Sequence, residues 1–271
     1  MKFSNKYDKS VWENFYTGER KIHIKPKAGL FTSYDVFLCD SIITKHIPSF
    51  SSYKKQKPKI TEIGSGDGKL LKKFADMLKM EPTGIEYSKE AARIAEKNGI
   101  KTIVADAFDK KFLAKYKNHF DVVFSYGFLE HILPPEKAAK IHYDILKPGG
   151  YVIIQIPRFK GFNLFKVKFL RPDLVPLHNF NVMNEDKLAK ACKDPRIEKI
   201  FCKNYGTFKF RFPMDKKNFR YYLLKTICYL EYLLNPCFRI LFGDRGFETY
   251  PFSPAVMFIG RKKLSKKANA S

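Results

Sequence analysis

The 271-residue sequence has little cysteine, and its cysteines match neither a disulfide framework nor a zinc site. There are five, an odd number, with no C-x-x-C pair among them. Small extracellular domains and structural zinc sites depend on paired or closely spaced cysteines, so we expect a reducing compartment. No H-E-x-x-H motif or carboxylate cluster occurs either. We therefore expect no metal site.

Long uninterrupted hydrophobic runs are also missing. The N-terminal residues lack the apolar stretch of a signal peptide. The most hydrophobic segment, residues 221–242, is interrupted by Lys225, Glu231, Pro236 and Arg239. A membrane-spanning helix needs about 20 mostly apolar residues, so this segment is not expected to cross a bilayer. These observations predict a cytoplasmic protein and leave peripheral membrane contact open.

Acidic residues are scarce relative to basic ones. The chain has 27 Asp and Glu against 51 Lys and Arg, which gives a formal net charge of +24. Such an excess attracts anionic partners, namely nucleic acid, acidic lipid headgroups or phosphorylated metabolites. The alternative is a lysine-rich surface that is simply solvated. The charge thus restricts the partners and leaves the fold open.

Between residues 59 and 157 the sequence alternates strand patterns with helical ones. Helical periodicity predicts helices at residues 68–80, 88–99 and 134–146. Short apolar runs predict strands at residues 59–63, 83–87, 100–106, 120–126 and 151–157, and a returning strand at 253–263. This alternation predicts an α/β fold, with a parallel, doubly wound sheet covered by helices on both faces.

The chain divides into three predicted parts. Residues 1–50 are expected to form a helical N-terminal cap. Residues 51–157, together with about 254–263, form the predicted core. Residues 158–253 are less regular, aromatic and basic, and we interpret them as a substrate-side insertion after the fifth strand.

The stretch "TEIGSGDGKL", residues 61–70, follows the first predicted strand and carries three glycines at every second position. The dinucleotide fingerprint G-x-G-x-x-G needs a third glycine one position later, where this chain has Lys69. Glu62 and Asp67 flank the loop. Carboxylates would repel a pyrophosphate but would favour a cationic ligand, so the loop is not typical of a dinucleotide enzyme.

"EIGSGDG" resembles the first motif of class I S-adenosylmethionine-dependent methyltransferases, including small-molecule and ubiquinone-type members. The resemblance covers about residues 59–157 and implies a Rossmann-like, mostly parallel sheet of seven strands. Further matches follow in order: "GIEYS", "VADAF", "FDVVFSYGFLEHI" and "LKPGGYVIIQIP". It implies S-adenosylmethionine as the cofactor, with Glu86 on the ribose hydroxyls and Asp106 on the adenine amino group. The implied cofactor-binding set is Glu62, Gly64, Ser65, Gly66, Gly68, Glu86, Tyr87, Asp106, Ala107 and Ser125.

Three residues are candidates for catalysis. The resemblance places Glu130 and His131, just past the fourth strand, near the transferred methyl group. His131 is the favoured base, because imidazole titrates near neutral pH; the alternative is a structural histidine. His178, in "PLHNF", resembles a substrate-facing histidine of small-molecule methyltransferases, although a loop-stabilising role stays open.

The acceptor is the least determined feature. The chain lacks the N/D-P-P-Y/F motif of amino-group methylation, since the equivalent loop is "SYGFLEH". This departure favours an oxygen or carbon acceptor on a small molecule, a glycan precursor or a lipid-linked compound. Two alternatives stay open: an RNA or protein methyltransferase, and an inactive methyltransferase fold serving as a basic binding module. The oligomeric state is not indicated.

The basic, aromatic region from residue 201 leaves three interpretations. Residues 201–225 carry seven Lys or Arg and one acid, which suits nucleic acid. A membrane-surface helix would expose Tyr221, Lys225, Cys228 and Tyr232. An ordinary subdomain would instead pack a different stripe inward, made of Phe219, Leu223, Leu230 and Leu234.

Overall fold

The computed structural model describes residues 33–51, 57–207, 209–211, 214, 217–246 and 251–264. Residues 1–32 of the predicted cap lie outside this set. Within the cap, α2 (Tyr34–His46) is a helix. Its buried side chains include Leu38 and Ile43.

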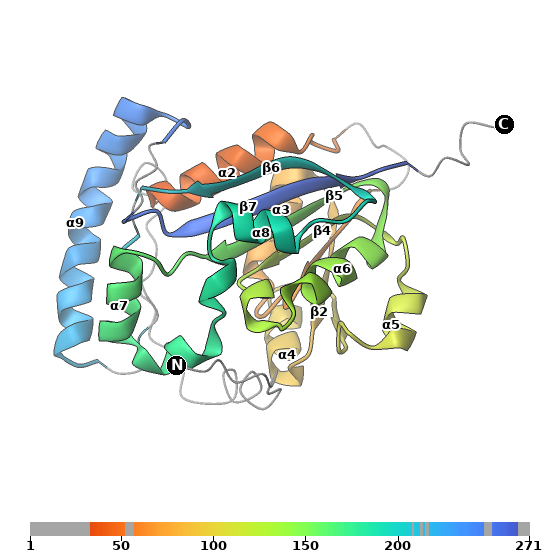
Figure 1. The fold of residues 1–271 in the computed structure, drawn as a ribbon, viewed down its shortest axis with the longest axis horizontal. Coiled ribbons are helices and arrows are strands. Elements are labelled where there is room, and N and C mark those ends of the chain that lie inside the picture. The colour runs from red at the N-terminus through yellow and green to blue at the C-terminus, as the bar shows by residue number, and fades with distance from the viewer. Residues whose placement is uncertain are drawn as a thin grey trace.

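One seven-stranded sheet forms the centre of the molecule (Figure 1). Its order is β3-β2-β1-β4-β5-β7-β6, with β7 antiparallel to both neighbours and the other pairs parallel. The strands are β1 (Lys59–Ile63), β2 (Glu81–Glu86), β3 (Thr102–Val104), β4 (Phe120–Tyr126), β5 (Leu146–Pro157), β6 (Ile197–Tyr205) and β7 (Ala255–Lys262). The predicted Rossmann-like, mostly parallel α/β sheet is confirmed.

Helices cover both faces of the sheet (Figure 1). α5, α6 and α8 pack on one face, and α2, α3 and α4 on the other. Their bounds are α3 (Lys69–Leu78), α4 (Lys89–Lys97), α5 (Lys110–Lys115), α6 (Pro135–Ile145) and α8 (Glu185–Ala191). Short 3-10 turns are η2 (Leu129–His131), η3 (Pro172–Leu177) and η4 (Phe180–Val182).

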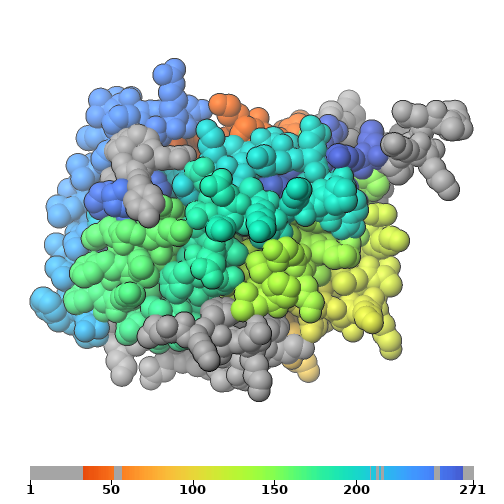
Figure 2. Space-filling view, viewed as in Figure 1, coloured from red at the N-terminus to blue at the C-terminus, as the bar shows by residue number. Residues whose placement is uncertain are grey.

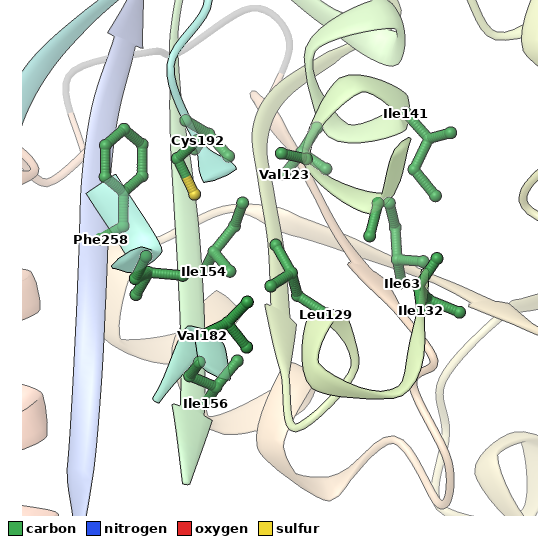
Figure 3. Packing of buried hydrophobic residues seen from close by; sticks show 14 of the residues in the cluster. Ile63, Val123, Leu129, Ile132, Ile141, Ile154, Ile156, Val182, Cys192 and Phe258 are labelled. Carbon is green, nitrogen blue, oxygen red and sulfur yellow. The ribbon is translucent and has the colours of Figure 1, made fainter. Parts of the chain in front are cut away.

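The core divides into two hydrophobic clusters because strand side chains alternate between the faces. On β4, Val123 joins the cluster under α6, whereas Val122 and Phe124 join the one under α3. Figure 3 shows the first cluster, where Leu129 packs among strand and helix residues. Leu129 is fully buried, so the chain just after β4 is fixed by packing immediately before Glu130.

Local signals account for several element ends. The Ser88 hydroxyl accepts a hydrogen bond from the Ala91 N–H at 3.2 Å and thereby caps the N-terminus of α4. The Asn184 side chain caps α8 in the same way, accepting from the Lys187 N–H at 2.8 Å. β6 lies inside the predicted insertion, where the sequence analysis located no strand. The "KPGG" turn falls within the bounds of β5.

Two further helices of the insertion lie beyond the sheet, at one end of the molecule (Figures 1 and 2). They are α7 (Phe162–Leu170) and α9 (Phe219–Phe242). A small cluster joins them, in which Leu170 packs with Tyr221, Leu224 and Cys228. No helix in the described part of the chain is both long and apolar enough to span a bilayer.

Both predicted orientations of α9 are wrong. Tyr221, Cys228 and Tyr232, expected outside in the membrane-surface interpretation, are buried. Phe219, Leu223, Leu230 and Leu234, expected inside in the subdomain interpretation, are exposed. The physical reason is that α9 is apolar on both sides, so its periodicity does not distinguish the inner stripe from the outer one.

Candidate functional site

The candidate site lies at the carboxyl edge of the parallel strands. β1 and β4 are neighbours, and the chain leaves β1 toward β2 on one side of the sheet before returning to β4. Strand order therefore reverses between β1 and β4, where open α/β sheets bind their ligands. The glycine loop after β1, Glu86 at the end of β2 and the segment after β4 all reach this edge.

The glycine loop has the backbone shape that its sequence predicts. Gly64, Gly66 and Gly68 have φ of +74°, +53° and +73°, a region that residues with a Cβ rarely adopt. The Gly64 N–H donates to the carbonyl oxygen of Ile85 at 2.9 Å. The Gly66 N–H donates to Glu86 Oε2 at 2.8 Å. The loop is thus tied to the end of β2.

Glu86 connects three segments of this edge. Its Oε1 accepts from the Ser88 N–H at 2.9 Å, while Oε2 holds Gly66. The carboxylate is buried. Each carboxylate oxygen has two lone pairs, so both retain capacity to accept from a vicinal diol. Behind the loop, Gly84 packs closely on Ser65, and a Cβ there would lie 2.5 Å from the Ser65 hydroxyl, which would have to move.

Three buried oxygens at this edge lack hydrogen-bond partners: Glu62 Oε2, Ser65 Oγ and Ser125 Oγ. Burial, followed by the nearby charges of Glu86 and Asp67, raises the pKa of Glu62 well above its ordinary value. A buried oxygen without a partner is costly unless a ligand supplies a donor or a positive charge. These oxygens therefore fit a cationic cofactor with hydroxyl and ammonium groups.

Asp106 stands just after β3, as predicted, and is half-buried with Ala107 buried beside it. Asp106 Oδ1 accepts from the Phe108 N–H at 2.9 Å, which fixes the carboxylate's orientation. Tyr87, also half-buried, follows Glu86. Glu86 with Tyr87, and Asp106 with Ala107, thus lie at the ends of the adjacent strands β2 and β3.

Two aromatic residues near the site were missed by the sequence analysis. Phe108 and Phe128 stack with ring centroids 6.2 Å apart. A Cβ added to Gly64 would meet Phe128 at 3.4 Å, so Phe128 packs directly on the glycine loop. The sequence could have indicated both residues through their closeness to predicted site residues, since Phe108 lies two residues after Asp106 and Phe128 lies two residues before Glu130.

The three predicted catalytic residues come together from two segments. Glu130 and His131 lie in η2 after β4, and His178 follows η3 in the insertion. The His131 and His178 rings have centroids 4.5 Å apart, and His131 Nε2 lies 3.7 Å from Glu130 Oε1. The Asn179 N–H donates to the Glu130 carbonyl oxygen at 2.8 Å, which holds the two segments in register.

Backbone contacts set the tautomer of both imidazoles. His131 Nδ1 lies 2.7 Å from the Leu177 carbonyl oxygen, and His178 Nδ1 lies 2.6 Å from that of Leu174. A carbonyl oxygen only accepts, so Nδ1 carries the proton and, in the neutral ring, Nε2 carries the lone pair. Phe159 packs edge-on against His178, with ring centroids 4.9 Å apart.

Burial changes the proton affinities in this cluster. It raises the pKa of Glu130 to about 8, and Glu130 Oε2 has no hydrogen-bond partner. Burial and the neighbouring His178 lower the pKa of His131 to about 3. The premise that His131 titrates near neutrality is therefore wrong, because it assumed a solvated imidazole. Of the two, Glu130 has the pKa closer to neutral pH.

The same cluster has the composition of a metal site. One ligand atom from each of Glu130, His131 and His178 lies within 4.8 Å of the others, and no second group of this kind occurs among the described residues. Two imidazoles and a carboxylate suit a divalent transition metal. All five cysteines are free thiols, and none belongs to this cluster.

The fold, the glycine loop and the carboxylates at the ends of β2 and β3 together define a class I methyltransferase. A family model described as "Methyltransferase domain" matches residues 38–195, more than half of the chain. The chain belongs to this family. The predicted methyltransferase domain is thereby confirmed.

Curated relatives match shorter stretches. An uncharacterised protein of Methanocaldococcus jannaschii is 35% identical over 114 residues, which are 42% of this chain and 48% of that protein. A ubiquinone biosynthesis O-methyltransferase of Proteus mirabilis is 28% identical over 98 residues, 35% of this chain and 40% of that enzyme. The chain thus spans less than half the length of these relatives.

Solved structures resemble the chain over most of its length. A possible histamine N-methyltransferase from Thermotoga maritima aligns with a TM-score of 0.53 and 20% identity, covering 86% of this chain and 92% of that one. A geranyl diphosphate C-methyltransferase from Streptomyces coelicolor aligns with a TM-score of 0.51 and 11% identity, covering 83% and 78%. At such identities the likeness shows the shared fold.

Proposed function

We propose that the chain transfers the methyl group of S-adenosylmethionine to an oxygen or carbon atom of a small molecule, glycan precursor or lipid-linked acceptor. The observation that carries this proposal is that the side chains of Glu130, His131 and His178 lie close together. Their segments lie at the same edge of the sheet as the glycine loop. The likeness to ubiquinone biosynthesis O-methyltransferases supports an oxygen acceptor. We further propose a cytoplasmic location.

The cofactor-binding residues are proposed from the donor and acceptor atoms at the edge. Glu86 takes the ribose hydroxyls, and Asp106 with Tyr87 and Ala107 borders the adenine. Glu62 and Ser125 offer their unsatisfied oxygens to the amino-acid end, over the backbone of Gly64, Ser65, Gly66 and Gly68. When bound, S-adenosylmethionine supplies a methyl group activated by a sulfonium.

The chain's own contribution to methyl transfer is positioning and proton acceptance. The leaving group of a sulfonium departs neutral, so the protein mainly aligns the acceptor and excludes water. The Nε2 lone pairs of His131 and His178 accept from other donor groups of the acceptor molecule, because its hydroxyl has a single hydrogen to donate. Glu130, whose Oε2 has no hydrogen-bond partner, takes the hydroxyl proton in its ionised form as the methyl group is transferred, and its pKa of about 8 makes that form the major one above neutral pH.

Incubation of the full chain with methyl-labelled S-adenosylmethionine and fractionated lysate tests the acceptor class. We expect label in the small-molecule or lipid fraction, and none when Glu86→Ala replaces the native chain. Label in RNA or protein would overturn the proposed acceptor and favour the alternative suggested by the net charge of +24. No label in any fraction would favour an inactive binding module.

A further inference from the structure

The outward side of α9 carries a stripe of exposed apolar residues that methyl transfer does not use. We define this outer stripe by Phe219, Leu223, Leu230, Leu233, Ile240 and Leu241, all exposed. Ile240 is 83% exposed and Leu233 65%. Over 24 residues the helix is about 36 Å long. An apolar strip of this length is uncommon on a monomeric protein surface and marks a contact site.

α7 widens the stripe into a two-helix surface. Phe165 and Phe169 of α7 are exposed and stack with ring centroids 6.1 Å apart. Arg220 of α9 lies 4.8 Å over the Phe169 ring and donates Nη1–H to the Phe169 carbonyl oxygen at 2.9 Å. The outer stripe together with Phe165 and Phe169 is called the α7–α9 face below.

The exposed charges within the two helices have one sign, although Asp173 and Asp244 are exposed just beyond the ends of α7 and α9. On α7 and α9, the charged residues with solvent access are Lys168, Arg220, Lys225 and Arg239, all cations. The one acid of the two helices, Glu231, is buried. A second copy would therefore place cations against cations, with +24 already on each chain. Like charges brought together oppose self-association, whereas an anionic surface would be attracted.

Aromatic residues beside the stripe are of the interfacial kind. Tyr222 and Tyr229 are exposed along α9, and a tyrosine combines an apolar ring with a polar tip. Such residues are enriched where hydrocarbon meets headgroups. Apolar side chains rimmed by lysine and arginine are typical of helices that lie in the plane of an anionic membrane.

We propose that the α7–α9 face is a docking surface for an anionic phospholipid bilayer, on which α9 lies parallel to the membrane plane. The apolar stripe enters the headgroup boundary, and Lys168, Arg220 and Lys225 contact lipid phosphates, whereas the Arg239 guanidinium lies 4.2 Å over the Phe37 ring of α2 on the inward side of α9. The chain from α7 passes through η3 to His178, so docking would hold the acceptor side of the site close to the membrane. This inference goes beyond the proposed function and does not depend on it.

Sedimentation of the full chain with lipid vesicles tests the inference. We expect binding to vesicles that mix phosphatidylcholine with phosphatidylglycerol, and about a hundred-fold weaker binding to phosphatidylcholine alone, since each cation near the surface contributes about five-fold. The double variant Leu233→Glu/Ile240→Glu places charges on the apolar stripe and should weaken binding by about ten-fold or more. Both positions are largely exposed, so the fold should persist.

Two sets of control variants distinguish binding through the α7–α9 face from attraction by the overall positive charge of the chain. Leu264→Glu makes the same change at a residue that is 69% exposed but lies after β7, and it should bind vesicles like the native chain. Lys168→Ala and Lys225→Ala should each weaken binding by about five-fold, an effect that high salt removes. Affinity for S-adenosylmethionine should stay unchanged in all of these variants.

Three results would overturn the inference. The native chain could fail to bind anionic vesicles, or Leu264→Glu could lose binding as fully as the double variant. Sedimentation equilibrium could instead show a dimer that Leu233→Glu/Ile240→Glu dissociates, which would assign the face to a second copy. Failure of cofactor binding in the native chain would contradict the proposed function alone and leave the vesicle result standing.

Discussion

The carboxyl edge of the sheet and the α7–α9 face distribute polarity in opposite ways. At the edge, polar atoms such as Glu62 Oε2 and Ser125 Oγ are buried without partners. On α9, apolar side chains such as Leu233 and Ile240 are exposed. Both arrangements are costly for an isolated chain. The comparison teaches that each region is complementary to something else, a cationic cofactor in one case and a lipid surface in the other.

Among the variants that test how the two regions differ, the largest change in turnover is expected when Glu130 is replaced. Replacement Glu130→Gln keeps the shape of the side chain but removes its ability to take a proton. We expect turnover to fall about a thousand-fold, within the range for loss of a general base, while cofactor affinity changes less than about two-fold. Single-turnover kinetics and calorimetry measure the two quantities.

Glu136→Gln makes the same change on the exposed surface of α6 and should leave turnover intact. A native rate in Glu130→Gln would contradict its role as the proton acceptor. A parallel loss of cofactor affinity would mean that Glu130 belongs to the binding edge instead.

Gly66→Val should have the next largest effect. Gly66 has φ of +53°, and a β-branched residue there distorts the loop that Glu86 holds. We expect affinity for S-adenosylmethionine to fall about a hundred-fold, in line with the strain of such a backbone conformation. Isothermal titration calorimetry gives the dissociation constants.

Gly99→Val is the matched control, because Gly99 has φ of +82° but open space around its Cβ position. It lowers stability through the same backbone strain without touching the loop, so its cofactor affinity should remain native. Equal affinity losses in the two variants would show that strain alone, and not the loop, accounts for the effect.

The smallest effect is expected where the insertion joins the core. A hydrogen bond from Arg196 lowers the pKa of Asp194, and Arg196 also pairs with Asp144 of α6 at 2.7 Å. A lowered carboxyl pKa stabilises the fold above the ordinary Asp value of about 4 and loses this effect as pH falls through the folded value. Asp194→Asn should therefore cost about 1 kcal/mol at pH 7.

Urea denaturation at neutral and acidic pH measures this difference. The difference in free energy of unfolding between Asp194→Asn and the native chain (the stability gap) should disappear at low pH, where the native carboxyl is protonated. Asp76→Asn, on the exposed side of α3, should show no gap at either pH. A gap that persists in acid would mean that the ion pair is not its source.

Local signals made the sheet predictable from the sequence. β1 and β4 have the bounds that their apolar runs predicted, because both strands are buried on two faces. β6 was not located, since it is an edge strand that pairs only with β7 and exposes Glu198, Lys199 and Ile200. An edge strand of mixed polarity has no regular pattern to find.

The part of the site formed by the glycine loop and Glu86 was predictable, because it depends on the backbone at the ends of neighbouring strands. The contact between Gly66 and Glu86 joins two adjacent strand ends, and the resemblance to the methyltransferase family had assigned both residues to one cofactor site. The proton affinity of His131 was not predictable, because its burial depends on Leu177 and His178, 46 and 47 positions further along the chain. The exposed side of α9 was missed for the same reason, as it depends on packing against α7.

Calorimetry of the full chain with S-adenosylmethionine and with NAD tests the central claim most directly. The account predicts that S-adenosylmethionine binds at one site per chain, that NAD does not compete, and that Glu86→Ala weakens binding about thirty-fold by removing the acceptor of the Gly66 and Ser88 N–H groups. Glu81→Ala, at the exposed start of β2, should bind normally. Native affinity in Glu86→Ala, or preference for NAD, would contradict the assignment of this edge to a methyl donor.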